Sequence, residues 1–137
     1  MTEHHKTTIL VACVAALGIA ACGDEATPPL EAVPGELLVR VESPKGLEGA
    51  AVLETADEGV VEITGDGGQL FQWRQDGNIR IVVLLDTPGE IRFVLEVEDI
   101  NSPPQLRLVE VADPDNRLRA GLLFYRVIAE PRIGGGS

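Results

Sequence analysis

Short apolar runs, each ended by turn residues, follow one another from residue 36 to residue 130. Several alternate strictly between apolar and polar residues, as in "ELLVRVE" (36–42) and "EIRFVLEVED" (90–99). Alternation with a period of two places one set of side chains on each face of a β-strand. A helical period is absent over most of this region, so the chain is predicted to fold as an all-β protein.

The turns between the expected strands are rich in glycine, proline and acidic residues. The pair Asp76-Gly77 between two apolar runs predicts a tight hairpin. Five consecutive apolar residues, Ile81 to Leu85, predict a central strand that is buried on both faces. The sequence "RLRAGL" (117–122) suggests one helical turn before the last strand. The expected strands cover 36–42, 49–55, 59–64, 69–73, 78–86, 90–99, 105–113 and 117–130.

Seven or eight strands at this spacing favour a single immunoglobulin-like β-sandwich of mainly antiparallel strands, with a barrel as the rival architecture. A domain of roughly 100 residues buries somewhat over 60% of its extended surface. The segment 36–130 is therefore long enough to form one hydrophobic core without disulfide bonds.

The N-terminal segment contains an unbroken run of 13 apolar or small residues, Ile9 to Ala21. A membrane-spanning helix needs about 20 such residues, so the run is predicted to be part of an export signal. Leu10-Val11-Ala12-Cys13 and Ile19-Ala20-Ala21-Cys22 both resemble the lipobox of bacterial lipoproteins. Cleavage before Cys13 would leave a hydrophobic region of four residues, whereas such regions need about 7–15. Cys22 is therefore the expected lipidation site, with Ile19, Ala20 and Ala21 as its lipobox.

The resemblance to lipoproteins implies a division of the chain into four parts. Residues 1–21 are expected to be a signal peptide that is removed, and residues 22–35 to be the lipidated cysteine and a flexible tether with three prolines. Residues 36–130 form the sandwich, and 131–137 a flexible tail. The protein would be exported and anchored in the bacterial cell envelope, at the outer membrane or cell surface, by the lipid on Cys22. The alternative is an ordinary secreted protein in which this cysteine stands by chance.

Charge and residue content narrow the classes of function. The formal net charge is −11, and removal of residues 1–21, which hold one Lys and one Glu, leaves it unchanged. Such a domain repels nucleic acid, so no nucleic-acid partner is expected. His4, His5 and Cys13 lie in the segment expected to be removed. The mature chain would then have no histidine and no thiol besides Cys22, which excludes a Ser-His-Asp site and a zinc site built on histidine or thiolate.

Carboxylates are the remaining reactive groups. A pair of acids can hydrolyse glycosides, but no pair in this sequence stands out, and no enzymatic activity is expected. Calcium is the cofactor that the acidic turns suggest, at Asp113, Asp115 and Asn116 in "VADPDN". The same residues are typical of a type I turn, which is the favoured interpretation.

Few aromatic residues are present to bind a sugar ring. Phe71 and Trp73 stand two apart and so share one face of their expected strand, and Tyr125 lies in the last run. These three side chains are the candidate ligand-binding residues. A Phe-x-Trp pair at strand spacing more often belongs to the hydrophobic core, and the core is the favoured interpretation here.

Strand patterns in the domain resemble the short cohesin-type sandwiches of bacterial surface proteins. The similarity rests on "ELLVRVESP", "GAAVLE" and "VLLDTPGEIRFVLEVED". It implies a two-sheet sandwich with a role in binding, and it implies no functional residue. The expected function is a non-catalytic envelope lipoprotein that acts as a protein-interaction or scaffolding module. A carbohydrate-binding module at the cell surface is the alternative, and a carboxylate-based glycoside hydrolase is third.

Overall fold

The computed structural model describes residues 28–133, which contain eight β-strands and no helix. The predicted all-β class is therefore confirmed. Each expected strand has a counterpart, although several boundaries differ. The strands are β1 (Gly35–Glu42), β2 (Glu48–Ala56), β3 (Val60–Gly65), β4 (Gln69–Gln75), β5 (Asn78–Gly89), β6 (Ile91–Val97), β7 (Arg107–Ala112) and β8 (Arg126–Pro131).

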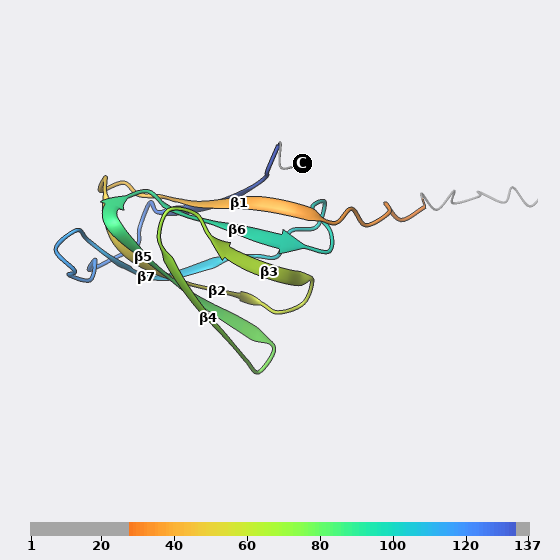
Figure 1. The fold of residues 1–137 in the computed structure, drawn as a ribbon, viewed down its shortest axis with the longest axis horizontal. Coiled ribbons are helices and arrows are strands. Elements are labelled where there is room, and N and C mark those ends of the chain that lie inside the picture. Colours follow the sequence, from red (N-terminus) through yellow and green to blue (C-terminus); the bar gives the residue numbers. More distant parts are fainter. Residues whose placement is uncertain (1–27, 134–137) are drawn as a thin grey trace, which may run out of the picture.

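The strands form two four-stranded antiparallel sheets packed as a sandwich (Figure 1). Sheet A has the order β3-β6-β1-β8, and sheet B has the order β4-β5-β2-β7. Consecutive strands often lie in different sheets, so most pairings join segments far apart in the sequence. β1 pairs with β6 and β8, and β2 pairs with β5 and β7.

The core lies between the sheets and is filled by the inward set of each alternating strand. In β1 and β6 these are the residues that alternation predicts, with Val39 and Phe93 both 0% exposed. Burial of this apolar surface is the main stabilising contribution to such a fold. The fully buried side chains include Leu37, Val39, Val41, Leu53, Ile79, Ile81, Val83, Ile91, Phe93, Leu95 and Val97.

The hairpin predicted at Asp76-Gly77 is present and joins β4 to β5. Both residues have positive φ, 51° for Asp76 and 76° for Gly77. Gln75 and Asn78 pair on either side of them. A two-residue connection with two positive φ values has the twist that antiparallel strands need, and Asp-Gly adopts it readily.

Two predictions about the strands are wrong. β5 has an interior place in sheet B, but it is buried on one face only. Ile81 and Val83 are in the core, whereas Leu84 is 40% exposed on the outer face of sheet B. No second layer covers that face within residues 28–133, because the eight strands make only two sheets.

The second error concerns residues 117–122, which form no helical turn. Residues 113–125 form a loop, and β8 begins only at Arg126. Arg119 N–H donates to the carbonyl of Val111 at 2.8 Å, and Asp113 N–H donates to the carbonyl of Arg117 at 2.9 Å. These bonds hold the loop against the end of β7, so residues 117–122 do not form a helical turn.

Candidate binding face

The outer face of sheet B exposes large apolar side chains, unlike an ordinary solvent-facing sheet. Strand register places its side chains in rows that cross β4, β5 and β2. One row, called here the apolar row, consists of Phe71, Val82 and Val52. The next row along the strands, called the charged row, consists of Trp73, Arg80, Glu54 and Arg107. Leu84 extends the apolar area on the other side.

Phe71 and Trp73 are 51% and 46% exposed, so the prediction that they belong to the core is wrong. Their strand, β4, is at the edge of sheet B. Leu70 takes the inward position and packs against the core, and alternation then turns Phe71 and Trp73 outward. The expectation that they share a face is confirmed, and that face is open to solvent.

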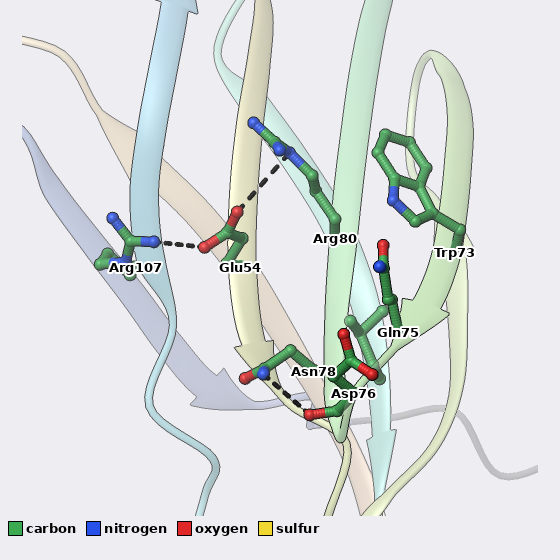
Figure 2. Close-up of a pocket in the computed structure, with 8 residues that line it drawn as sticks. Glu54, Trp73, Gln75, Asp76, Asn78, Arg80 and Arg107 are labelled. Atoms are coloured by element: carbon green, nitrogen blue, oxygen red, sulfur yellow. Dashed lines mark hydrogen bonds and ion pairs between the residues drawn. The ribbon is translucent and has the colours of Figure 1, made fainter.

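The charged row is linked by a continuous chain of contacts (Figure 2). The guanidinium of Arg80 lies 6.0 Å from the centroid of the Trp73 ring, at the limit of a cation–π contact. On its other side, Arg80 Nε lies 3.6 Å from Glu54 Oε1. Arg107 also forms an ion pair with Glu54. The aromatic ring, two cations and one carboxylate thus lie next to one another along one row.

A shallow depression of about 390 Å³ follows the charged row towards the β4–β5 hairpin. Trp73 forms one wall, and the amides of Gln75 and Asn78 lie beside it (Figure 2). Amide, guanidinium and carboxylate groups supply both donors and acceptors. The lining of this depression is mostly polar, and Trp73 supplies its one large aromatic surface.

The third candidate ligand-binding residue, Tyr125, is not part of this face. Its hydroxyl donates a hydrogen bond to Glu48 Oε1 at 2.6 Å, near the start of β2. Trp73 pairs with Arg80, which pairs in turn with Glu54 near the end of β2. The structure therefore brings Phe71 and Trp73 together and places Tyr125 at the other end of the sandwich.

Tyr125 belongs to a polar cluster around a buried carboxylate that the sequence did not indicate. Glu48 is 1% exposed and accepts hydrogen bonds from Ser43 Oγ at 2.6 Å and from Arg119 Nε at 3.0 Å. Burial and the bond to Glu48 raise the pKa of the Tyr125 hydroxyl, and the same carboxylate raises the pKa of Arg119. Every oxygen of Glu48 is thus satisfied, as a buried charge requires.

Simple alternation points to the wrong residue at this position. Ala51 and Leu53 face the core, so a regular strand would turn Gly49 inward and Glu48 outward. A register shift between Glu48 and Ala50 in the pairing of β2 with β5 reverses this order. A β-bulge redirects side chains in this way. The sequence around Glu48 gives no sign of this bulge.

Asp113 acts on the backbone of its own turn. Its Oδ1 accepts hydrogen bonds from the N–H groups of Asp115 and Arg117, both at 2.9 Å. The bond from Arg117, with that from Asp115, lowers the pKa of Asp113. Asn116 has φ of 63°, the left-handed conformation that asparagine tolerates. Among residues 28–133 no group of three or more His, Cys, Asp or Glu side chains is arranged to hold a metal ion. Calcium at Asp113, Asp115 and Asn116 stays a prediction.

The predicted lipobox Ile19-Ala20-Ala21 and the lipidation site Cys22 lie outside the described residues. Residues 28–34 precede β1 as exposed chain, and Val33 N–H donates to Asp99 Oδ1 at 3.1 Å. That bond, with one from Asn101, lowers the pKa of Asp99. Over residues 28–133, no helix is long and apolar enough to cross a membrane.

Comparison with known proteins adds no assignment. No protein-family model, curated protein or solved structure shows significant similarity to this chain.

Proposed function

We propose that this protein is a non-catalytic binding module, lipid-anchored in the cell envelope through Cys22, that binds a protein partner with the outer face of sheet B. The observation that carries the proposal is the exposure of Phe71, Trp73 and Leu84 on one sheet face, beside paired arginines. Folding of a sandwich requires apolar side chains only on the inner faces. Apolar side chains gathered on an outer face indicate a surface that is covered in the working state.

The composition of the face fits a protein partner. Aromatic residues and arginine are enriched at protein interfaces, and Trp and Arg contribute most of the binding energy there. Trp73, Phe71, Arg80 and Arg107 lie within two adjacent rows. The rigid strands that carry them limit the conformational entropy lost on binding.

A glycan is the second candidate ligand, and one observation favours it. Trp73 is half-exposed beside a depression that also offers the amides of Gln75 and Asn78. A sugar ring stacked on the indole would find both donors and acceptors in reach. A carboxylate-based glycosidase finds less support, because Glu54 is held in ion pairs with Arg80 and Arg107.

The tether is consistent with display of the whole domain above a membrane. Ten residues separate Cys22 from Val33, where hydrogen bonds to Asp99 and Ile100 fix the chain to the domain, and they can extend to roughly 35 Å. That reach leaves both outer faces of the sandwich free of the anchoring bilayer. The acidic net charge of −11 further opposes contact with an anionic membrane.

Site-specific photocrosslinking in living cells tests the proposal. A photoreactive residue at Gln69 reports on the outer face of sheet B, and one at Thr64 reports on the outer face of sheet A. We expect Gln69 to crosslink to a discrete protein, and Trp73→Ala to abolish that crosslink. Val61→Ser is the matched control, because Val61 is 50% exposed but lies on β3 of sheet A.

Equal crosslinking from both positions, or crosslinks that survive Trp73→Ala, would contradict the protein-binding face. Crosslinks to glycan alone would favour the second candidate. In that case the emission of Trp73, which is the only tryptophan in the chain, should respond to purified envelope glycans.

A further inference from the structure

The loop 113–125 exposes three large apolar side chains within seven residues. Leu118 is 68% exposed, Leu123 75% and Phe124 78%. Leu47, in the loop between β1 and β2, is 60% exposed. Leu118, Leu123 and Phe124 border one hollow, at the end of the sandwich away from the charged row. The proposed function makes no use of this hollow.

The exposure of these side chains is not due to a lack of contacts between the loop and the sandwich. Arg119, in the middle of the loop, bonds to the buried carboxylate of Glu48 at 3.0 Å. Leu122 and Tyr125 pack against the core, and Tyr125 N–H donates to the carbonyl of Leu122 at 3.1 Å. The residues between them, Leu123 and Phe124, are thereby held outward.

Phe124 also has an unfavourable backbone conformation. Its φ is 69°, in the left-handed region that non-glycine residues with bulky side chains rarely adopt. The strain brings no burial in return, since the ring faces solvent. Strained conformations that the surrounding structure maintains are concentrated at functional sites.

The apolar side chains border a hollow of about 690 Å³, within the size range of ligand pockets. Lys45, Arg117 and Arg119 line it together with Leu118, Leu123 and Phe124. Asp113 is the only acid among the described lining residues, and its Oδ1 is occupied by two backbone N–H groups. A cationic, largely apolar hollow is unexpected on a chain of net charge −11.

We propose that this hollow binds an amphiphilic anion, a single alkyl chain that ends in a carboxylate or phosphate. The alkyl chain would lie against Leu118, Leu123 and Phe124. Lys45 and Arg117 would take the anionic head, since Arg119 is committed to Glu48 through Nε and Nη2. The ion pair of Arg117 with Asp115, at 3.9 Å between side chains 78% and 73% exposed, is too weak to compete.

The position of the hollow separates this ligand from the anchoring membrane. β1 runs from Gly35, where the tether arrives, to Glu42, which leads into the loop that contains Lys45. The two loops whose residues line the hollow, 43–47 and 113–125, thus lie at the opposite end of the sandwich from the start of β1 (Figure 1). A free single-chain amphiphile, not the anchoring bilayer, is the source that this arrangement favours.

Photoaffinity labelling with peptide mapping tests the inference on the full chain carrying Cys22→Ser, which avoids added lipid. The probe is a diazirine analogue of dodecanoate below its micelle concentration. We expect labels on residues 118–124, competed by dodecanoate and dodecyl phosphate but not by dodecyltrimethylammonium, acetate or inorganic phosphate. Lys45→Glu with Arg117→Glu should weaken labelling about tenfold or more, the loss expected from a charge-assisted contact.

Leu123→Ser and Phe124→Gly should also weaken labelling, and Phe124→Gly should do so without any loss of fold, because glycine accepts positive φ. Arg132→Glu and Val61→Ser are controls for charge reversal and loss of an exposed apolar group elsewhere. Equal competition by the cationic amphiphile, labelling unaffected by charge reversal, or labels only outside residues 113–125 would overturn the proposal. Binding to anionic phosphatidylglycerol vesicles with no binding of free dodecanoate would overturn it in favour of a membrane surface.

Discussion

The two outer faces of the sandwich are built on the same alternating pattern but differ in the apolar side chains that they expose. On sheet A, Arg40 lies 3.2 Å from Glu42, 4.0 Å from Glu90 and 3.7 Å from Glu130, and Arg92 lies 3.5 Å from Asp66. On the outer face of sheet B, the apolar row of Phe71, Val82 and Val52 lies beside the charged row. Ion pairs occur on both faces, but among the described strands only sheet B exposes large aromatic side chains, Phe71 and Trp73.

The sandwich fold does not require the exposed apolar side chains on the outer face of sheet B. Charged residues on the outer face of sheet A keep the domain soluble and need no partner. Apolar residues on the outer face of sheet B contribute little to the core and carry a risk of aggregation. Their presence is accounted for if a partner covers them.

The largest expected effect compares two phenylalanines, Phe93 on the inner face of sheet A and Phe71 on the outer face of sheet B. Phe93 is 0% exposed, so Phe93→Ala should lower the free energy of unfolding by about 3–5 kcal/mol. Phe71 is 51% exposed, so Phe71→Ala should lower it by about 1 kcal/mol or less. Urea denaturation measures both. A loss from Phe71→Ala as large as that from Phe93→Ala would mean that the aromatic face is structural.

The next comparison concerns two glutamates that both pair with arginine. Glu48 is buried, and Glu48→Ala should lower the free energy of unfolding by about 3 kcal/mol, because it leaves Arg119 without its counter-ion. Glu54→Ala on the charged row should lower it by about 1 kcal/mol or less, since its ion pairs face solvent. Similar losses from both, measured by urea denaturation, would show that the charged row is part of the structural framework.

A smaller effect separates Tyr125 from the binding face. The pKa of Tyr125 is raised in the folded state, so the folded protein holds this proton more tightly than the unfolded chain. Stability from this group is present below the ordinary tyrosine pKa of about 10 and is lost as pH rises through the folded value. Tyr125 is the only tyrosine, so ultraviolet absorbance of tyrosinate reports its ionisation directly. A partner on sheet B should leave that titration unchanged.

The smallest effect concerns the ion pairs of sheet A. The hydrogen bond from Arg126 lowers the pKa of Glu42, so the pair stabilises the fold above the ordinary glutamate pKa and loses its contribution as pH falls through the folded value. NMR titration of Arg126→Gln should show the Glu42 pKa move upward, with partner binding unaffected. Weakened partner binding in this variant would place part of the interface on sheet A.

Alternation in the sequence was enough to predict the class of fold and most of the inner face, as Val39 and Phe93 illustrate. It could not predict which strands have a covered outer face, so the apolar run Ile81 to Leu85 was assigned to a strand buried on both sides. For a related reason the sequence favours the core for Phe71 and Trp73 over a ligand-binding role. An aromatic residue that contacts a partner and one that packs in the core occur in the same local sequence pattern.

Glu48 shows a different limit of prediction. Its burial depends on a bulge in β2 and on Ser43, Arg119 and Tyr125, which lie up to 77 residues from Glu48 in the sequence. Likewise, the sequence predicts a helical turn at 117–122, but the structure has a loop there. The bonds of Arg119 to Val111 in β7 and to Glu48 hold this loop, and both bonds are non-local. Local propensity has no access to such contacts.

Hydroxyl-radical footprinting in intact cells tests the central claim most directly. Phe71 and Trp73 should be oxidised readily in the purified protein and severalfold less in the envelope, where a partner covers them. Ile133 and Val61, which are 99% and 50% exposed, serve as controls and should be oxidised equally in both states. Equal oxidation of Phe71 and Trp73 in cells and in the purified protein would contradict the assignment of the outer face of sheet B as the binding face.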